Sequence, residues 1–313
     1  GSGGLLHKIE GTNFTGSLLV GHSTTGTISS AEYNTGVGIS ALDALTTGDR
    51  NTVLGYGAGG VLISASDNVL IGYLTGDAIT TGIRNVAIGT NALSAEDAHG
   101  YNVAVGHGAL QVQNAGANAY NVAVGYEAGV AVTTGISNTL IGALAGDALT
   151  TGSSNVAIGL DALDAEDTGS RNIAVGHNAL KALNYDGYGY NVAIGHSAGK
   201  AVSTGIENIL VGGLAGDALT TGERNVAIGH AVLGTEDTGS RNTAVGWSAL
   251  TTLNYDGNGY NTAMGYAAGM SVTTGTNNTI IGALAGDAIT TGSHNVAIGY
   301  EALTTEDTGQ RNV

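Results

Sequence analysis

The sequence of 313 residues has no cysteine and no proline, and it has a single phenylalanine and a single tryptophan. The absence of cysteine excludes a disulfide framework, a thiolate zinc site and a cysteine nucleophile. Charged residues make up only 11% of the chain, and 25 acidic against 9 basic residues give a net charge of −16. Because that charge repels phosphates and anionic lipids, we expect no nucleic acid partner. No apolar run approaches the roughly 18 residues of a membrane span, so we expect no membrane insertion.

Glycine is abundant, with 54 residues, and it recurs in a block where asparagine is followed by Val, Thr or Ile and, four residues on, by glycine. The separation between successive blocks is 17, and from Asn51 onward every fourth separation is 19, so a longer period of 70 leads from Asn51 to Asn121. The asparagines that open these blocks are Asn34, Asn51, Asn68, Asn85, Asn102, Asn121, Asn138, Asn155, Asn172, Asn191, Asn208, Asn225, Asn242, Asn261, Asn278, Asn295 and Asn312.

The unit that starts at Asn155 illustrates the expected local structure. Val156 and Ile158 alternate with Ala157, which is the period of a β-strand. A second short strand is expected near Ala162, and TTG or EDTG closes each unit as a turn. Such units predict an all-β fold, a parallel β-solenoid or β-roll whose coils stack about 4.8 Å apart in a rod on the order of 75 Å long. Helix is disfavoured because glycine recurs inside every unit and β-branched residues fill the apolar positions.

The two sides of the strand segment differ in bulk. We expect Val156 and Ile158 to fill the inside of the thin roll, and Ala157 with its glycine neighbours to form a smooth outward face. A thin roll buries little area per coil, so packing of several copies through the small-residue face would bury the remainder. The sequence therefore predicts a homo-oligomer.

The block NVAIGxxALxxxxTG, at Asn85, Asn155 and Asn295, resembles two known repeat types. One is the SVAIGxxAxAxG coil of trimeric autotransporter adhesin heads, and the other is the NTAVGxxAL…TTG repeat of phage tail-fibre proteins. The resemblance covers roughly residues 34–313, and only Thr75 and Val232 replace the alanine of the block's eighth position. The adhesin heads use shorter coils than the 17 or 19 residues found here. The asparagine start and the TTG spacing are also closer to the phage type.

This resemblance implies an elongated, parallel, left-handed β-roll homotrimer that forms part of a longer fibre. We expect residues 1–33 to be a lead-in segment and residues 34–313 the solenoid domain. The predicted function is a non-enzymatic structural or adhesive segment, of the phage tail-fibre type, on the virion surface and involved in host attachment. The alternatives are a bacterial trimeric adhesin head on the cell surface and an ice-binding solenoid.

Three regular polar features have structural interpretations. The asparagine column is expected to form a hydrogen-bonded ladder at a corner of the coils. Threonine pairs, which an ice-binding face would use, are expected to serve as turns; they are Thr46-Thr47, Thr80-Thr81, Thr133-Thr134, Thr150-Thr151, Thr220-Thr221, Thr273-Thr274 and Thr290-Thr291. Acidic residues recur in register as Asp77, Asp147, Asp217 and Asp287, and as Glu96-Asp97, Glu166-Asp167, Glu236-Asp237 and Glu306-Asp307.

The acidic pairs suggest solvated turns, with Arg171 and Arg241 as partners of their carboxylates. Calcium is the alternative, but it requires six to eight converging oxygens. The histidines follow no metal-ligand spacing, and no triad or phosphate loop is present. We therefore predict no enzyme activity, no metal ligands and no cofactor, with calcium as the one open possibility.

The 19-residue units carry the most informative variation, because two extra residues in a solenoid must bulge outward. Their loops hold most of a cluster of aromatic and acidic residues that could contact a sugar through a flat ring and hydroxyl acceptors. The glycan-binding candidates are Tyr185, Asp186, Tyr188, Tyr190, Trp247, Tyr255, Asp256 and Tyr260. His107 and His177 share the register position of Trp247. The alternative is that these rings only cover the edge of the roll and pack against the next subunit.

Overall fold

The computed structural model describes residues 7–11, 14–21 and 28–313, and the chain divides into two compact units, residues 1–154 and residues 155–313. The strands of the first unit are β1 His7–Gly11, β2 Phe14–Val20, β3 Thr35–Val37, β4 Thr52–Leu54, β5 Val69–Ile71, β6 Val86–Ile88, β7 Val103–Val105, β8 Val122–Val124 and β9 Thr139–Ile141. Those of the second unit are β10 Val156–Ile158, β11 Ile173–Val175, β12 Val192–Ile194, β13 Ile209–Val211, β14 Val226–Ile228, β15 Thr243–Val245, β16 Thr262–Met264, β17 Thr279–Ile281 and β18 Val296–Ile298.

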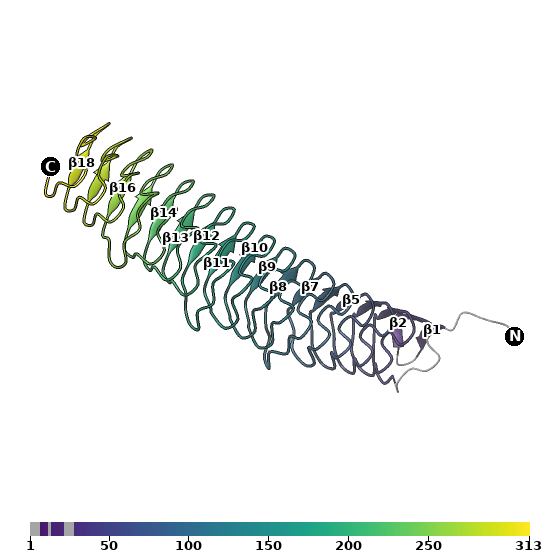
Figure 1. The fold of residues 1–313 in the computed structure, drawn as a ribbon. Helices are drawn as coiled ribbons and strands as arrows, with labels where there is room; N and C mark the ends of the chain where they lie inside the picture. The colour runs from purple at the N-terminus through teal and green to yellow at the C-terminus, as the bar shows by residue number, and fades with distance from the viewer. Residues whose placement is uncertain (1–6, 12–13, 22–27) are drawn as a thin grey trace. The chain divides into compact units, whose positions relative to one another are not determined.

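Within each unit the strands pair in parallel with their neighbours in chain order (Figure 1). Val156 pairs with Ile173, and Ile173 pairs in turn with Val192, so equivalent positions of successive coils lie side by side. At the start of the first unit, β1 pairs antiparallel with β2, and β2 pairs in parallel with β3. The described residues contain no helix, and hence none with the length and apolar composition that a membrane crossing requires. The prediction of an all-β parallel solenoid is confirmed.

Each coil holds one regular strand of three residues, not the two or three strands that the sequence suggested. The segment at Ala162 and Leu163, expected to be a second strand, is a turn in which Leu163 has a φ of 57°. The strand ends at Gly159, whose φ of 136° is strained for any residue with a side chain. A Cβ there would also lie 2.6 Å from the carbonyl carbon of Gly176 in the next coil. The coil is thus one short strand closed by tight turns.

The expected orientation of the strand residues is wrong. Ala157 is fully buried, whereas Val156 and Ile158 are half-exposed, and the strands repeat this pattern along both units. Most strands place alanine at this inward position, because leucines such as Leu163 and Leu183 already occupy much of the narrow interior. Every fourth strand has a larger inward residue, since Leu70, Leu140 and Ile280 are also fully buried there, and the outward positions hold mainly Val, Ile and Thr.

Candidate functional site

The asparagine column forms a buried ladder that fixes the coils in register. The backbone N–H of Asn51 donates to Oδ1 of Asn34 at 2.9 Å, and Nδ2 of Asn51 donates to the carbonyl of Ala65 at 2.8 Å. Asn172 and Asn155 make the equivalent backbone contact at 3.0 Å in the second unit. Each side chain therefore satisfies backbone groups that a narrow interior would leave unpaired. The ladder residues from Asn34 to Asn295 have no access to a ligand, because all of them are buried, and only Asn312 is half-exposed.

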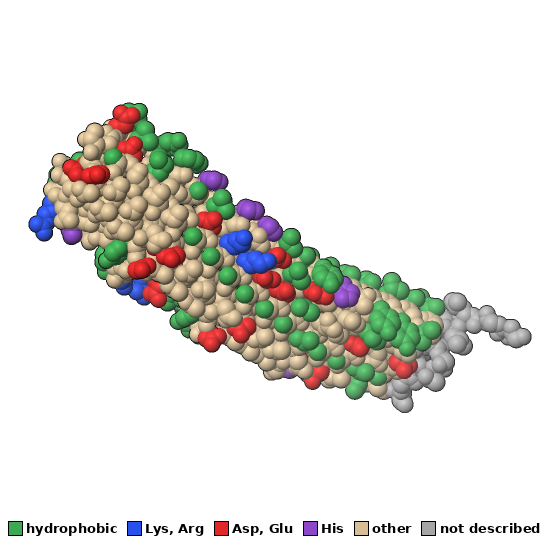
Figure 2. Space-filling view, in the orientation of Figure 1, with side chains coloured by type: hydrophobic (Ala, Val, Ile, Leu, Met, Phe, Trp, Pro, Cys, Tyr) green, Lys and Arg blue, Asp and Glu red, His purple; other side chains and the backbone are tan. Residues whose placement is uncertain are grey.

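Outside the ladder, the outward residues of the strands form an aliphatic face in each unit. Ile194, Ile209 and Met264 remain 41%, 41% and 47% exposed, respectively. Figure 2 shows hydrophobic and histidine side chains along the edge that carries the strands in Figure 1. Because equivalent positions lie side by side in the parallel pairing, each outward column repeats at the strand spacing of about 4.8 Å.

An aromatic column flanks this face on one side, five residues after the ladder asparagines. Trp247 stacks on Tyr266 with ring centroids 5.1 Å apart and an interplanar angle of 11°. In the first unit Tyr56 stacks on Tyr73 at 5.4 Å. Two further pairs occupy the same position, His107–Tyr126 at 5.4 Å and His177–His196 at 5.3 Å. The coil spacing alone brings these rings to stacking distance, so the column is a direct product of the register.

A second exposed column lies on the other side of the face, directly before the ladder asparagines. Arg171 places its guanidinium 3.9 Å from the ring centroid of Tyr188 and 5.5 Å from that of Tyr190, and it also donates to the Tyr190 hydroxyl. Tyr101 and Tyr120 stack at 5.1 Å in the first unit. Arginine therefore orders the exposed rings by cation–π contact.

Arg171 and Arg241 were expected to pair with the acidic turns, and that expectation is wrong. Arg171 contacts Tyr188 and Tyr190, and Arg241 donates to Oδ1 of Asn258. Arginine does pair with a carboxylate at the same column position elsewhere in the first unit. There Nε of Arg50 lies 2.5 Å from Oδ1 of Asp67, and this hydrogen bond lowers the pKa of the Asp67 carboxyl.

In the loops of the 19-residue coils, the other predicted residues are either half-buried or already hydrogen-bonded within the protein. Tyr185 and Tyr255 are half-buried. Asp186 and Asp256 each accept a hydrogen bond from a threonine of the preceding coil, Thr168 at 2.5 Å and Thr238 at 2.6 Å. Each of these carboxylates therefore has one oxygen engaged in tethering its loop.

The eight glycan-binding candidates consequently do not form one site. Tyr188 and Tyr190 meet edge to face at 6.0 Å, whereas the ring contact of Trp247 is with Tyr266, in the column on the other side of the face. Tyr260 lies 5.8 Å from the guanidinium of Arg241. The sequence analysis missed the stacking partners Tyr266, Tyr126, Tyr56, Tyr73 and His196. Their common position, five residues after a ladder asparagine, was the signal that could have identified them.

Three of the four acidic pairs are not the solvated turns that the sequence suggested, whereas Glu306 is half-exposed and Asp307 is exposed. Glu96, Glu166 and Glu236 are fully buried, while the aspartates beside them stay accessible. Oε1 of Glu166 accepts the backbone N–H of Gly169 at 2.6 Å, and burial raises the pKa of Glu166 to about 7. Burial likewise raises the pKa of Glu236 and of the corner aspartates Asp77 and Asp217. The three glutamates are thus core groups of the coils, while Asp77 and Asp217 are half-exposed at the corners.

The second unit also has a shallow depression of about 530 Å³ in which Lys181 and Lys200 adjoin Asp217. Nζ of Lys181 is held 2.7 Å from Oδ2 of Asp161. Nζ of Lys181 also lies 3.6 Å from Oδ2 of Asp164, so carboxylates balance the two ammonium groups of this depression.

Comparison with known proteins gives no further assignment. No family model, no curated protein and no solved structure matches this chain. Function must therefore be argued from the two aromatic columns, the aliphatic face between them and the buried polar groups.

Proposed function

We propose that this chain is a non-enzymatic structural and adhesive fibre segment, of the phage tail-fibre type, that contacts surface glycans through its aromatic columns. The observation that carries the proposal is the exposed ring column with centroids 5.1 to 5.4 Å apart, repeated in both units on a scaffold locked by the asparagine ladder. Such a segment would lie on the virion surface, or on the cell surface in the alternative of a bacterial adhesin.

A stacked ring column suits a long, repetitive sugar polymer. The flat apolar face of a pyranose packs on an aromatic ring, and the hydroxyls of the sugar form hydrogen bonds with polar groups beside the ring. Trp247 and Tyr266 stack on each other, so a sugar would pack on the outer faces of this pair or along its exposed ring edges. Individually weak contacts repeated along the chain add up through avidity.

We also propose a parallel homotrimer, held by the aliphatic outward face and not by the small-residue face that the sequence suggested. The alanines of that face are buried in the core and cannot meet another chain. The outward Val, Ile and Met side chains remain half-exposed in a single chain, and their burial against two further copies would stabilise the assembly.

The threonine pairs give the ice-binding alternative less support. Oγ1 of Thr46 donates to the carbonyl of Ile63 at 2.9 Å, and Thr220 donates to Asp237 at the same distance. These bonds, the second of them to the backbone carbonyl of Asp237, use only the first hydroxyl of each pair. The second threonine, such as Thr47 or Thr221, is exposed, so only half of the hydroxyls are withdrawn from ordering water.

The glycan proposal is tested with the double variant Trp247→Ala/Tyr266→Ala on an array of surface polysaccharides. We expect a loss of binding of at least roughly tenfold, because both stacked rings are removed. Tyr300→Ala is the matched control, since Tyr300 stands at the same position and is 71% exposed but is in none of the stacked pairs. Unchanged binding in the double variant, with the assembly intact, would reduce the chain to a shaft.

The trimer is tested by sedimentation of the parent and of Ile194→Lys/Ile228→Lys. Both isoleucines lie on the outward face, so the added charges should dissociate the assembly without disturbing the core. A parent that sediments as a monomer would contradict the trimer and leave the glycan proposal standing.

A further inference from the structure

One coil of the first unit, residues 85–101, departs from its counterparts at a buried carboxyl. In the second unit the sequence Glu166-Asp167-Thr168-Gly169 places a glycine three residues after the glutamate, and Glu236 and Glu306 are likewise followed by Gly239 and Gly309. The equivalent residue after Glu96 is His99. An imidazole therefore replaces a hydrogen atom at a point where a Cβ on Gly169 would lie 2.5 Å from the Glu166 carboxylate.

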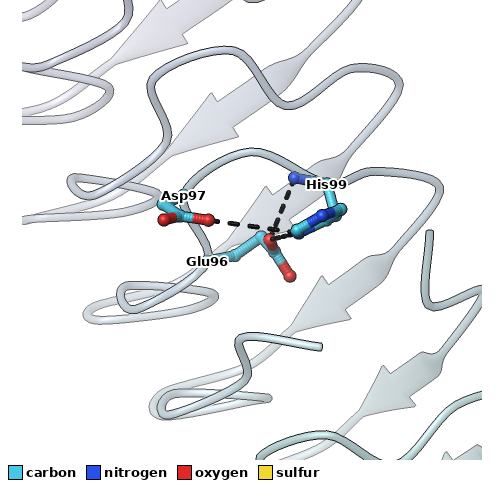
Figure 3. Close-up of side chains that lie close together, drawn as sticks. All are labelled: Glu96, Asp97 and His99. Atoms are coloured by element: carbon cyan, nitrogen blue, oxygen red, sulfur yellow. Dashed lines mark hydrogen bonds and ion pairs between the residues drawn. The ribbon is translucent and has the colours of Figure 1, made fainter. Parts of the chain in front are cut away.

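The imidazole turns toward the carboxylates, as Figure 3 shows. Nδ1 of His99 lies 3.2 Å from Oε1 of Glu96 and 4.0 Å from Oδ1 of Asp97. One ligand atom from each of the three residues lies within 4.8 Å of the other two. With zinc–ligand distances of about 2.0 to 2.1 Å, adjacent ligands of a tetrahedral site are about 3.3 Å apart. Glu96 and His99 already have that spacing, and a small rotation of the exposed Asp97 completes it.

The interior behind this cluster is polar where the other copies are apolar. Gln113, fully buried, stands where the second unit has Leu183 and Leu253. Its Nε2 lies 3.4 Å from Oε2 of Glu96, and its Oε1 accepts Nδ2 of Asn121 at 3.1 Å. A buried amide behind a ligating carboxylate orients it, as the outer residues of metal sites do. The substitution is independent of His99 and serves the same carboxylate.

Charge and access also fit a cation. Two carboxylates meet here, and within the described part of the chain no lysine or arginine forms an ion pair with either of them. The side chain of His99 is 25% exposed and that of Asp97 is 52% exposed, whereas Glu96 is 0% exposed. An ion would enter from solvent between His99 and Asp97, with Glu96 as the inner ligand.

We propose that Glu96, Asp97 and His99 bind one divalent transition-metal ion of the zinc class, with water as the fourth ligand. A nitrogen ligand together with two carboxylates selects such an ion over calcium, which takes six to eight oxygens. This proposal departs from the expectation, drawn from the sequence, that the histidines follow no metal-ligand spacing. The ion would join the turn of this coil to its buried carboxyl, and it stands apart from the proposed glycan contacts.

The test uses the full chain, stripped with a chelator and titrated with zinc by calorimetry and with cobalt by visible absorption. We expect one zinc per chain and the intense bands of four-coordinate cobalt. His99→Gly gives this turn the residue of its counterparts, which fold in the same chain, and should abolish both signals. His177→Ala/His196→Ala is the control for the stacked histidine pair and should leave them unchanged.

A gain of binding provides the second arm. Thr238→Ala/Gly239→His/Leu253→Gln recreates the sequence Glu-Asp-Ala-His and the buried amide behind it in the second unit. A Cβ at residue 239 would lie 2.4 Å from the carboxyl carbon of Glu236, so this side chain must turn as Glu96 does, and the variant should then add a second zinc. Absence of saturable binding by the parent chain would overturn the proposal. Binding that survives His99→Gly, or that is lost only in His177→Ala/His196→Ala, would overturn it as well.

Discussion

The coils of residues 85–120 in the first unit and those of residues 155–190 in the second have equal lengths and the same ladder asparagines, yet they treat one buried carboxyl differently. Glu166 is served by backbone donors, Gly169 at 2.6 Å and Tyr185 at 3.4 Å. Glu96 is served by the side chains of His99 and Gln113 as well as by backbone. Backbone donors alone can therefore satisfy a buried carboxylate in these coils. The side-chain partners His99 and Gln113 are an addition that the coil does not need for folding.

The largest expected effect distinguishes the apolar and polar versions of one position. Leu183→Ala should lower the free energy of unfolding by about 3 to 4 kcal/mol, because it leaves a cavity in a narrow core. Gln113→Leu should lower it by only about 1 to 2 kcal/mol, since it exchanges two hydrogen bonds, of 3.4 Å to Glu96 and 3.1 Å from Asn121, for apolar burial. Denaturant midpoints, with hydrogen exchange to locate the affected coils, measure both. Equal losses in the two variants would contradict the distinction.

The next effect is a pH dependence that the second unit owes to its backbone-served carboxyls. Burial raises the pKa of Glu166 from 4.5 to about 7, so the folded chain binds this proton more tightly than the unfolded chain. Its contribution to stability is full below about pH 4.5 and is lost as pH rises through about 7. The loss should reach about 2 to 3 kcal/mol for this group.

Glu166→Gln/Glu236→Gln tests this dependence, because the amide keeps the acceptor for Gly169 and Gly239 but cannot ionise. Thermal unfolding at pH 5 should be similar for parent and variant, and at pH 8 the variant should be the more stable. If the two curves fall in parallel between pH 5 and pH 8, other groups cause the dependence.

The period of the fold could be predicted from the sequence because one residue type marks it. The asparagine spacing predicts that each strand residue pairs with its equivalent in the next coil, and Val156 does pair with Ile173. The orientation of the strand was predicted wrongly. Alternation identifies two faces but does not say which is buried, and the larger side chains, Val156 and Ile158, were assigned to the interior because of their size. Asn155 has the same parity as Ala157, and a ladder of amides bonded to backbone needs burial. That shared parity was the physical signal for an alanine-lined core.

The site was less predictable because it depends on neighbours that lie a whole coil away along the chain. Trp247 was chosen for its ring, but its stacking on Tyr266 follows only from the register of two coils. Asp186 was chosen for its charge, although a hydrogen bond from Thr168 already holds it. The buried position of Glu96 arises from the turn that encloses it, which composition does not reveal.

The smallest expected effect concerns Ala119, the third departure of the first unit, where the second unit has Gly189. A Cβ on Gly189 would lie 2.2 Å from Oδ1 of Asn172, an atom that accepts both the backbone N–H and Nδ2 of Asn191 at 3.3 Å. In the first unit, which has the methyl group, Nδ2 of Asn102 is buried without a hydrogen-bond partner among the described residues. The alanine thus accompanies an unpaired side-chain amide, while the backbone N–H of Asn121 still donates to Oδ1 of Asn102 at 3.1 Å.

Gly189→Ala should therefore weaken the corresponding rung in the second unit. The lost hydrogen bonds cost about 1 to 2 kcal/mol, and the reduced conformational freedom of the unfolded chain offsets about 0.5 kcal/mol of that loss. We expect a net loss of about 1 kcal/mol, with faster amide exchange at Asn191. Ala119→Gly is the reciprocal change and should let Nδ2 of Asn102 take a hydrogen-bond partner, as Nδ2 of Asn172 does with the carbonyl of Ser170 at 3.4 Å. Exchange of the Asn102 side-chain amide should then slow. If that exchange is unaffected, the unpaired amide has another cause than the Cβ of Ala119.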